Sequence, residues 1–280
     1  MQAINHKRKR FDGKVVLVTG ASSGIGRQTA IDFASHCSRT VILVSRSKLQ
    51  LAELEKSLRA KFNPEAAVAY PCDIANKSDV KIMGDEILGS FGHVDILVNN
   101  AGFGIYDNVQ NICIEDIESM TSTNYLGMVY CTKAFLDSML KRRSGHIVNV
   151  ASVAASFGVA GLSAYCATKY AVLGFSESLY HELHETGVAV TVVSPIAVKE
   201  TNFFNNESFK RYVPNYTGFA LTPEAVSRAI LDAARSPRLE IIIPFYLRAG
   251  IWFKHTLPYI FNPLFGMHFR KQLQKAKNER

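Results

Sequence analysis

Tyr165 and Lys169 carry side chains that can exchange a proton with a bound molecule. The two residues are four positions apart in a stretch, about 163–185, that reads as a long helix, so their side chains share one helix face. An isolated tyrosine hydroxyl titrates near about 10, and a nearby ammonium group favours the phenolate. We therefore expect Lys169 to lower the pKa of Tyr165 toward a value useful for acid or base catalysis.

Ser152 adds a hydroxyl group at the end of an apolar run. It follows the run His146–Ala151, which reads as a buried strand. A hydroxyl at this position can donate a hydrogen bond to an oxygen atom on which negative charge develops during a reaction.

A glycine-rich turn could hold a phosphorylated molecule. It lies between the apolar run Lys14–Thr19 and a helical stretch, and it reads Gly20, Ala21, Ser22, Ser23, Gly24, Ile25, Gly26. Glycines let the backbone approach a pyrophosphate, which the free N–H groups and the dipole of the helix N-terminus stabilise. The alternative is a glycine-rich turn that binds nothing.

Together these motifs resemble the short-chain dehydrogenase/reductase family. The Gly-x-x-x-Gly-x-Gly turn, Asn99-Asn100-Ala101-Gly102, Ser152 and Tyr165-x-x-x-Lys169 occur in family order over residues 14–243. The resemblance implies an oxidoreductase that interconverts a carbonyl and a secondary alcohol by hydride transfer, with Tyr165 as general acid or base. It implies the catalytic residues Asn124, Ser152, Tyr165 and Lys169, in which Asn124 supports a water-linked proton relay through the lysine.

The resemblance also implies a nicotinamide dinucleotide cofactor. Asp73 and Ile74 would flank its adenine. The full set of expected cofactor contacts is Gly20, Ser22, Ser23, Gly24, Ile25, Gly26, Arg46, Asp73, Ile74, Asn100, Ala101, Gly102, Tyr165, Lys169, Pro195, Val198 and Thr201. The competing hypothesis is a catalytically idle dinucleotide-sensing or scaffold protein on the same fold, and the intact set of four catalytic residues argues against it.

The residues after the second strand bear on the choice of cofactor. An NAD enzyme usually has a carboxylate there for the ribose 2′-hydroxyl, whereas this chain has Ser45-Arg46-Ser47. A guanidinium suits a 2′-phosphate, so we expect NADP(H) to be favoured over NAD(H). Alternatively, Arg46 is a solvated residue at a strand end.

One loop departs from the family pattern. Where the family shows Pro-Gly-x-Val-x-Thr, this chain has Pro195-Ile196-Ala197-Val198-Lys199-Glu200-Thr201. Because isoleucine tolerates a positive φ poorly, we expect a different backbone path here. Thr201 as a contact of the nicotinamide carboxamide rests on the resemblance.

Apolar β-branched runs alternate with amphipathic stretches along the chain. This pattern predicts an α/β fold, a Rossmann-type doubly wound parallel sheet of about seven strands in a single domain, with ligands at the carboxyl ends of the strands. The expected strands are 14–19, 40–45, 67–72, 95–98, 146–151, 189–193 and 240–243. The first expected helix follows the glycine turn and ends at about residue 36. The others span 48–62, 77–91, 114–125, 127–141, 163–185 and 223–234.

Three segments flank or interrupt this predicted domain. Residues 1–13 are expected to form a basic arm. Residues 201–221 resemble a substrate lid that is rich in aromatic residues. These aromatic residues either contact a bulky apolar substrate or pack on the core beneath the lid. By analogy with the family, the other walls of the substrate pocket are expected to be Phe103, Ile105, Tyr106 and residues 153–162. The extension 244–280 mixes aromatic and basic residues, which suits a membrane interface, a subunit contact or a substrate gate.

Composition limits the remaining possibilities. The net charge is +8, and much of the excess lies at the two ends of the chain. The sequence shows no export signal and no basic recognition helix. It also lacks a zinc-protease motif, because His181 and His184 are three rather than four residues apart. We expect a cytoplasmic protein with possible peripheral membrane contact, a small-molecule substrate, no nucleic acid and no metal, assembled as a homodimer or homotetramer.

Overall fold

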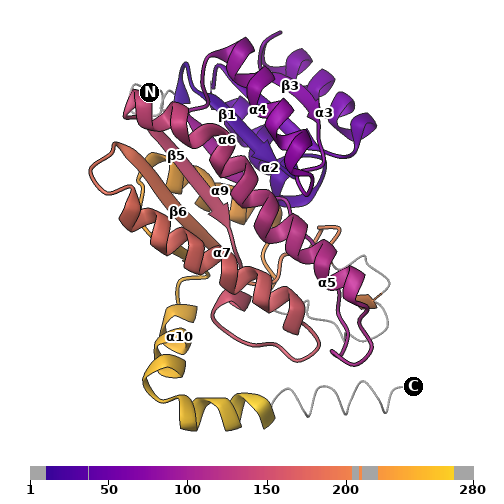
Figure 1. Cartoon of the computed structure of the whole chain (residues 1–280), viewed down its shortest axis with the longest axis vertical. Helices are drawn as coiled ribbons and strands as arrows, with labels where there is room; N and C mark the ends of the chain where they lie inside the picture. The colour runs from indigo at the N-terminus through magenta and orange to yellow at the C-terminus, as the bar shows by residue number, and fades with distance from the viewer. Residues whose placement is uncertain (1–10, 37, 204–207, 210–219, 268–280) are drawn as a thin grey trace.

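The protein is built on one seven-stranded parallel sheet (Figure 1). The computed structural model describes residues 11–36, 38–203, 208–209 and 220–267. The strand order is β3-β2-β1-β4-β5-β6-β7. The strands are β1 (Val15–Thr19), β2 (Thr40–Ser45), β3 (Ala67–Pro71), β4 (Ile96–Asn99), β5 (Gly145–Val150), β6 (Val188–Pro195) and β7 (Glu240–Ile243). The doubly wound sheet predicted from the sequence is confirmed, with strand ends shifted by one or two residues.

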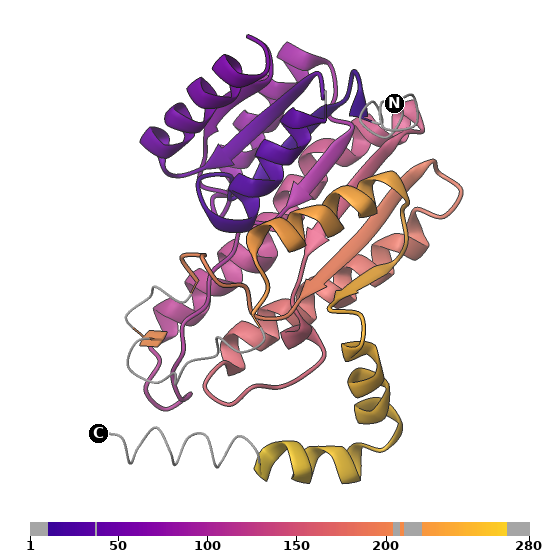
Figure 2. The same ribbon diagram turned by 180° about the vertical axis from the view of Figure 1, so that it is seen from behind.

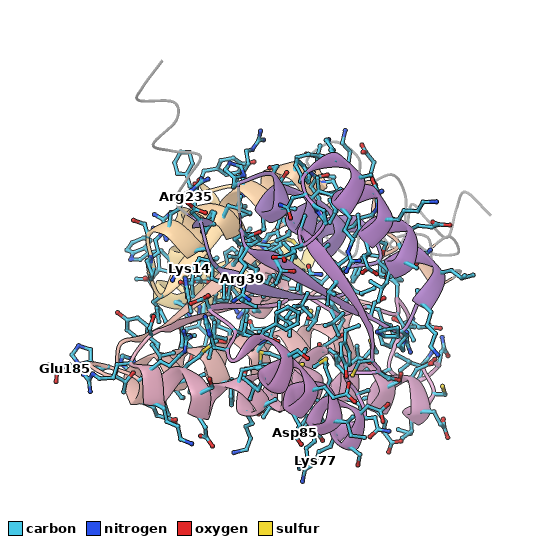
Figure 3. The ribbon with its side chains drawn as sticks, turned by 90° about the horizontal axis from the view of Figure 1, so that it is seen from above. Lys14, Arg39, Lys77, Asp85, Glu185 and Arg235 are labelled. Carbon is cyan, nitrogen blue, oxygen red and sulfur yellow. The ribbon has the colours of Figure 1, made fainter. Side chains whose placement is uncertain are left out.

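Helices cover both faces of the sheet, and Figure 3 shows the two layers with the sheet between them. One layer contains α2 (Gly24–Ser35), α3 (Lys48–Lys61) and α9 (Pro223–Arg235). The other contains α4 (Lys77–Phe91), α6 (Gly127–Arg142) and α7 (Ser163–Glu182), with α5 (Ile114–Thr121) leading into α6. The central strands are therefore buried on both faces, which explains their continuous apolar runs.

The folded core begins before the first strand. Phe11 is 2% exposed, and its ring lies 4.9 Å from the ring of Phe33 on α2. Part of the segment expected to be a basic arm is thus a buried element of the core; residues 1–10 lie outside the described residues.

The order of the strands creates the place for a ligand. The chain runs outward from β1 through β2 to β3, and then returns to pair β4 with the other side of β1. The helices that follow β1 and β4 therefore leave in opposite directions, which opens a crevice at the carboxyl ends of these strands.

Beyond β7, the chain forms an element that we call the C-terminal cap, residues 244–267. It contains α10 (Leu247–Thr256) and a second helical stretch at 258–267, and it lies below the carboxyl ends of the strands (Figures 1 and 2). Leu257 separates the two stretches, and Pro258 follows it. Among the described helices, none combines the length and apolar character needed to cross a bilayer.

At the amino ends of the strands, Asp95, which immediately precedes β4, contacts residues of several elements. One carboxylate oxygen accepts a hydrogen bond from the backbone N of Val15, 2.9 Å away, at the start of β1. The other lies 3.3 Å from Lys14 Nζ and 3.4 Å from a guanidinium nitrogen of Arg142, at the end of α6. Burial raises the pKa of Asp95, but the Val15 hydrogen bond and the charges of Lys14 and His93 outweigh it and hold the pKa below its usual value.

We predict that Asp95→Asn lowers the free energy of unfolding by about 1.5–3 kcal/mol at neutral pH, because hydrogen bonds to a charged group are lost. The native pKa lies below the unfolded value of about 3.9, so the carboxylate stabilises the fold above that pH. The difference from wild type therefore shrinks as the pH falls through the acid range. Urea unfolding at neutral and acidic pH measures both effects.

Asp85→Asn is the matched control. Asp85 forms an exposed ion pair with Lys81 on α4, and Figure 3 shows it on the outer surface. Exposed pairs contribute about 0–1 kcal/mol. Equal losses for the two variants would contradict the role given to Asp95.

Candidate active site

A single continuous cavity of about 1170 Å³ lies at the carboxyl ends of the central strands. Arg46 lies at one end of it, Ser152 and Tyr165 lie farther along, and residues of the C-terminal cap line the far wall. All site residues predicted from the sequence line this cavity except Gly26 and Asn124. The fold therefore brings the residues of the glycine turn and the predicted catalytic residues Ser152, Tyr165 and Lys169 to one cavity.

The glycine turn packs tightly against the loop after β4. Gly20 has a φ of +69°, and a Cβ added there would lie 2.9 Å from Ala101 Cα. A Cβ at Gly26 would collide with the carbonyl of Gly20 and lie 2.5 Å from Asn100 Nδ2. Gly26 is thus required behind the cavity wall. α2 begins at Gly24 without an acidic residue in its first turn, so its N-terminus remains favourable for an anion.

Arg46 lies exposed at the end of β2, within the same cavity. Its side chain has no hydrogen bond or ion pair with the described part of the chain. Ser45, Ser47 and Gln50 are its neighbours on the cavity wall. Asp73, whose Oδ1 accepts a hydrogen bond from Ala75 N, is the sole carboxylate among the described lining residues.

Lys169 is buried at the centre of the site. Its side chain is carried by α7, the residue is 5% exposed, and Nζ donates a hydrogen bond to the carbonyl of Val150 at 3.0 Å. Desolvation by burial lowers the pKa of Lys169 to about 8. The ammonium form still predominates at neutral pH.

Tyr165 precedes Lys169 by one turn of α7 and is also buried. Lys169 Nζ lies 5.7 Å from the centre of the tyrosine ring. Burial raises the pKa of Tyr165, and a hydrogen bond with Ser152 acts in the opposite direction without reversing this. The expectation that Lys169 lowers the pKa of Tyr165 is therefore wrong for this structure, because desolvation of the phenolate outweighs the favourable influences.

Ser152 is held at the end of β5. Its Oγ accepts a hydrogen bond from Ala154 N at 3.1 Å, which caps the short 3₁₀ turn η3 (Val153–Ala155). The hydroxyl also lies 3.4 Å from the Pro195 carbonyl. The fixed backbone leaves the hydroxyl facing the cavity beside Tyr165.

Asn124 occupies an unexpected π-helical turn, η2 (Ser122–Leu126), which joins α5 to α6. Its side chain donates to the Phe103 carbonyl and Thr168 Oγ1, and accepts from Phe103 N. A Cβ at Gly102 would lie 3.0 Å from Asn124 Oδ1 and 3.5 Å from Lys169 Nζ. Asn124 thus lies beside the lysine but fixes the loop after β4, and its role in a water-linked relay stays a prediction.

In the atypical loop after β6, Glu200 has a left-handed backbone conformation, with a φ of +58°. Val198 forms a bridge with Leu221, and Thr201 Oγ1 donates to the Val198 carbonyl. A Cβ at Gly24 would lie 3.1 Å from Thr201 Cγ2. The altered path therefore still brings Thr201 against the glycine turn.

The described part of the expected lid packs on Tyr165. The Phe203 ring lies 5.0 Å from the rings of Tyr165 and Phe209, and Phe209 lies 5.7 Å from Tyr106. Phe103, Tyr106, Phe203 and Phe209 line the cavity, whereas Ile105 does not. Phe204, Tyr212, Tyr216 and Phe219 lie outside the described residues.

The C-terminal cap supplies one wall of the cavity. Tyr246, Leu247, Gly250, Phe261 and Phe265 all line the cavity. A substrate gate was one of three alternatives for this extension, and the aromatic residues were the signal that pointed to it.

Comparison with known proteins establishes the family. The profile described as short chain dehydrogenase matches residues 14–211. Epidermal retinol dehydrogenase 2 of Mus musculus is 34% identical over 259 residues, which cover 91% of this chain and 82% of that protein. This chain belongs to the short-chain dehydrogenase/reductase family and is an oxidoreductase with a Rossmann nucleotide-binding fold.

Two solved structures share the fold over most of their length. A short-chain dehydrogenase/reductase from Burkholderia phymatum in complex with NAD has a TM-score of 0.79 and 26% identity, covering 89% of this chain and 95% of that one. A short-chain dehydrogenase from Sphingobium yanoikuyae in complex with NADPH has a TM-score of 0.77 and 28% identity, covering 90% and 95%. Since both dinucleotides occur among these relatives, the choice of cofactor depends on this chain's own residues.

Proposed function

We propose that the protein interconverts an apolar ketone and its secondary alcohol with NADP(H), and that Tyr165 is the general acid or base. The observation that carries this proposal is the single cavity that joins the glycine turn and Arg46 to Ser152, Tyr165 and Lys169. The residues present fit a dinucleotide, since Gly20 and Gly24 line the cavity at the N-terminus of α2, which has no acidic residue in its first turn.

A dinucleotide held by the glycine turn and Arg46 would supply a hydride to the carbonyl carbon, or accept one from the alcohol carbon in the reverse direction. Ser152 donates a hydrogen bond to the carbonyl oxygen as it becomes negative, and Tyr165 gives that oxygen its proton. The Lys169 ammonium, whose Nζ lies 5.7 Å from the centre of the Tyr165 ring, stabilises the phenolate that forms. In the reverse reaction this phenolate takes the proton of the alcohol.

We predict that Tyr165→Phe lowers kcat for ketone reduction at least about a hundredfold, because the proton donor is lost. Cofactor affinity should change little, since the ring remains in place. Stopped-flow NADPH oxidation and dinucleotide titration measure the two quantities.

Tyr180→Phe is the control, because Tyr180 is an exposed tyrosine on the same helix. Turnover by Tyr165→Phe within a few fold of wild type would rule out the assigned role.

The preference for NADP(H) rests on Arg46. A guanidinium without a partner in the described chain can bind a 2′-phosphate through charge-assisted hydrogen bonds, and no carboxylate directly follows β2. We predict that Arg46→Asp weakens NADPH binding at least about tenfold more than NADH binding. Lys48→Asp, two residues along at the start of α3, is the control for a general charge effect; equal losses of both cofactors in Arg46→Asp would overturn the assignment.

An apolar substrate is supported by the cavity wall. Phe103, Phe203 and Phe209 surround the catalytic tyrosine, and aromatic walls favour apolar groups. The name of the mouse relative, a retinol dehydrogenase, agrees with such a substrate.

Peripheral membrane contact through the C-terminal extension is also part of the proposal. The outer surface of the cap exposes Phe245, Trp252, Tyr259, Ile260, Leu264 and Met267. Glu279 is the only acidic residue from 244 to 280, against seven lysines and arginines. Exposed aromatic groups with an excess of positive charge suit the surface of an anionic bilayer.

Trp252 is the only tryptophan in the chain, so its fluorescence reports on this surface. We predict that its emission shifts to shorter wavelength with vesicles containing phosphatidylglycerol, and that the protein sediments with them. Pure phosphatidylcholine vesicles and Leu264→Asp should each reduce the shift. Equal binding to both kinds of vesicle would contradict the electrostatic part, and no binding to either would contradict the contact itself.

The cytoplasmic location and the homodimer or homotetramer stay predictions. Size-exclusion chromatography with light scattering tests the assembly directly.

A further inference from the structure

We propose that Lys254 is a positioning residue for the reaction: from α10 it fixes the turn that follows Ser152, and so holds the Ser152 hydroxyl beside Tyr165. The inference rests on the proposed function, because it serves the reaction assigned to those two hydroxyls. It concerns the rate of the chemical step and not the choice of substrate.

The residues after Ser152 form a compact turn that is closed by its own hydrogen bonds. The Ser152 carbonyl accepts a hydrogen bond from Ala155 N at 2.9 Å. The Val153 carbonyl accepts one from Ser156 N at 2.9 Å and another from Phe157 N at 3.1 Å. These bonds connect the whole turn, so a displacement of Ser156 also moves the backbone that carries the Ser152 hydroxyl.

The far end of this turn leaves two carbonyl groups for other elements to satisfy. The Phe157 carbonyl lies 3.7 Å from Cys166 Sγ on α7, and burial raises the pKa of Cys166, so the thiol keeps its proton and can donate it. Ser156 is 5% exposed, and a buried backbone carbonyl requires a donor. Among the described residues no backbone N–H bonds to the Ser156 carbonyl, and Lys254 Nζ donates to it.

Lys254 is itself held by several contacts. Its Nζ donates a hydrogen bond to the Tyr170 hydroxyl at 2.7 Å. The ammonium group lies 5.4 Å from the centre of the Tyr170 ring and 5.9 Å from that of Phe157, which favours a cation at this place. Tyr170 directly follows Lys169 on α7. One cation therefore connects the turn after Ser152 to the helix that carries the catalytic tyrosine and lysine.

This connection matters because the two reacting hydroxyls belong to different elements. Ser152 precedes the turn after β5, whereas Tyr165 is on α7, and a hydrogen bond between them lowers the pKa that burial raises at Tyr165. Both hydroxyls must reach one carbonyl oxygen, and a misplacement of about 1 Å can cost a factor of about 100 in rate. Every ketone presents its carbonyl to the same pair, so loss of Lys254 should slow all of them equally.

The same helix provides a matched control. Arg248, also on α10, donates a hydrogen bond to the Glu240 carbonyl on β7 at 3.0 Å. Arg248→Met therefore removes one attachment of the C-terminal cap without touching the turn after Ser152. The rings of Phe157 and Phe261, 5.7 Å apart, are a further attachment that remains in either variant.

The kinetic test uses Lys254→Met, which keeps a long side chain and removes its charge and donors. The single-turnover rate constant for NADPH oxidation at saturating ketone should fall about tenfold or more, by the same factor for 2-butanone and 2-decanone. KM should change by less than about threefold. Stopped-flow absorbance measures the rate constant. A partly unfolded sample would lower the amplitude of this phase but leave its rate constant unchanged.

Two further variants separate the contact with the turn from the attachment of the cap. Lys254→Arg keeps a cation that donates hydrogen bonds and stacks on aromatic rings, so its rate constant should stay within about threefold of wild type. Arg248→Met should stay within the same range. Circular dichroism verifies that each variant is folded. A loss confined to 2-decanone, equal losses in Lys254→Met and Arg248→Met, or an unchanged rate constant in folded Lys254→Met would each overturn the inference.

Amide hydrogen exchange separates the inference from the proposed function, because it requires no turnover. In the peptide that contains residues 153–157, exchange should be at least about fivefold faster in Lys254→Met than in wild type or Arg248→Met. If wild type reduces neither ketone, the proposed function fails, and faster exchange in Lys254→Met alone still supports the connection to the turn. Unchanged exchange in that variant would contradict the connection whatever the activity.

Discussion

Lys169 keeps its amino group inside the protein, where Nζ meets the Val150 carbonyl at the end of β5. A cation buried to this degree loses most of its hydration, and the loss appears as a pKa lowered to about 8. The charge is tolerable only if the carbonyl beside it stays in place. The end of β5 must therefore be held rigidly by its neighbours.

Polar contacts within the sheet supply that rigidity. Asn149 on β5 accepts a hydrogen bond from Asn99 on β4 and donates one to Ser176 on α7, and Asn99 also donates to Thr132 on α6. Two strands and two helices are thus joined directly beneath the catalytic residues. Because α7 carries both Ser176 and Lys169, the same network positions the lysine and the strand that receives its hydrogen bond.

Most of the fold was predictable from local patterns. Runs such as residues 40–45 and 188–195 are rich in valine and other β-branched residues and carry no charge, which suits burial on both faces of a parallel sheet. The glycine turn and the pair Tyr165 and Lys169 were predictable for the same reason, since each depends on residue types at fixed spacing in one element.

The features that were not predicted depend on tertiary packing. The π-helical turn at 122–126 inserts one residue into a continuous amphipathic pattern, and the left-handed residue of the loop after β6 is Glu200 rather than a glycine. The pKa of Tyr165 moves opposite to expectation because the folded chain buries its hydroxyl, which the local sequence does not reveal. The aromatic extension is compatible with several contacts, and only packing on Phe157 distinguishes them.

The cap follows β7, the last and outermost strand, and contributes no strand to the sheet. Changes within it therefore leave the strand order unaltered, although Phe261 and Lys254 contact the loop after β5. The pairing of the seven strands thus depends on residues before 244, and substitutions on the exposed face of the cap change the surface of the molecule without changing that pairing.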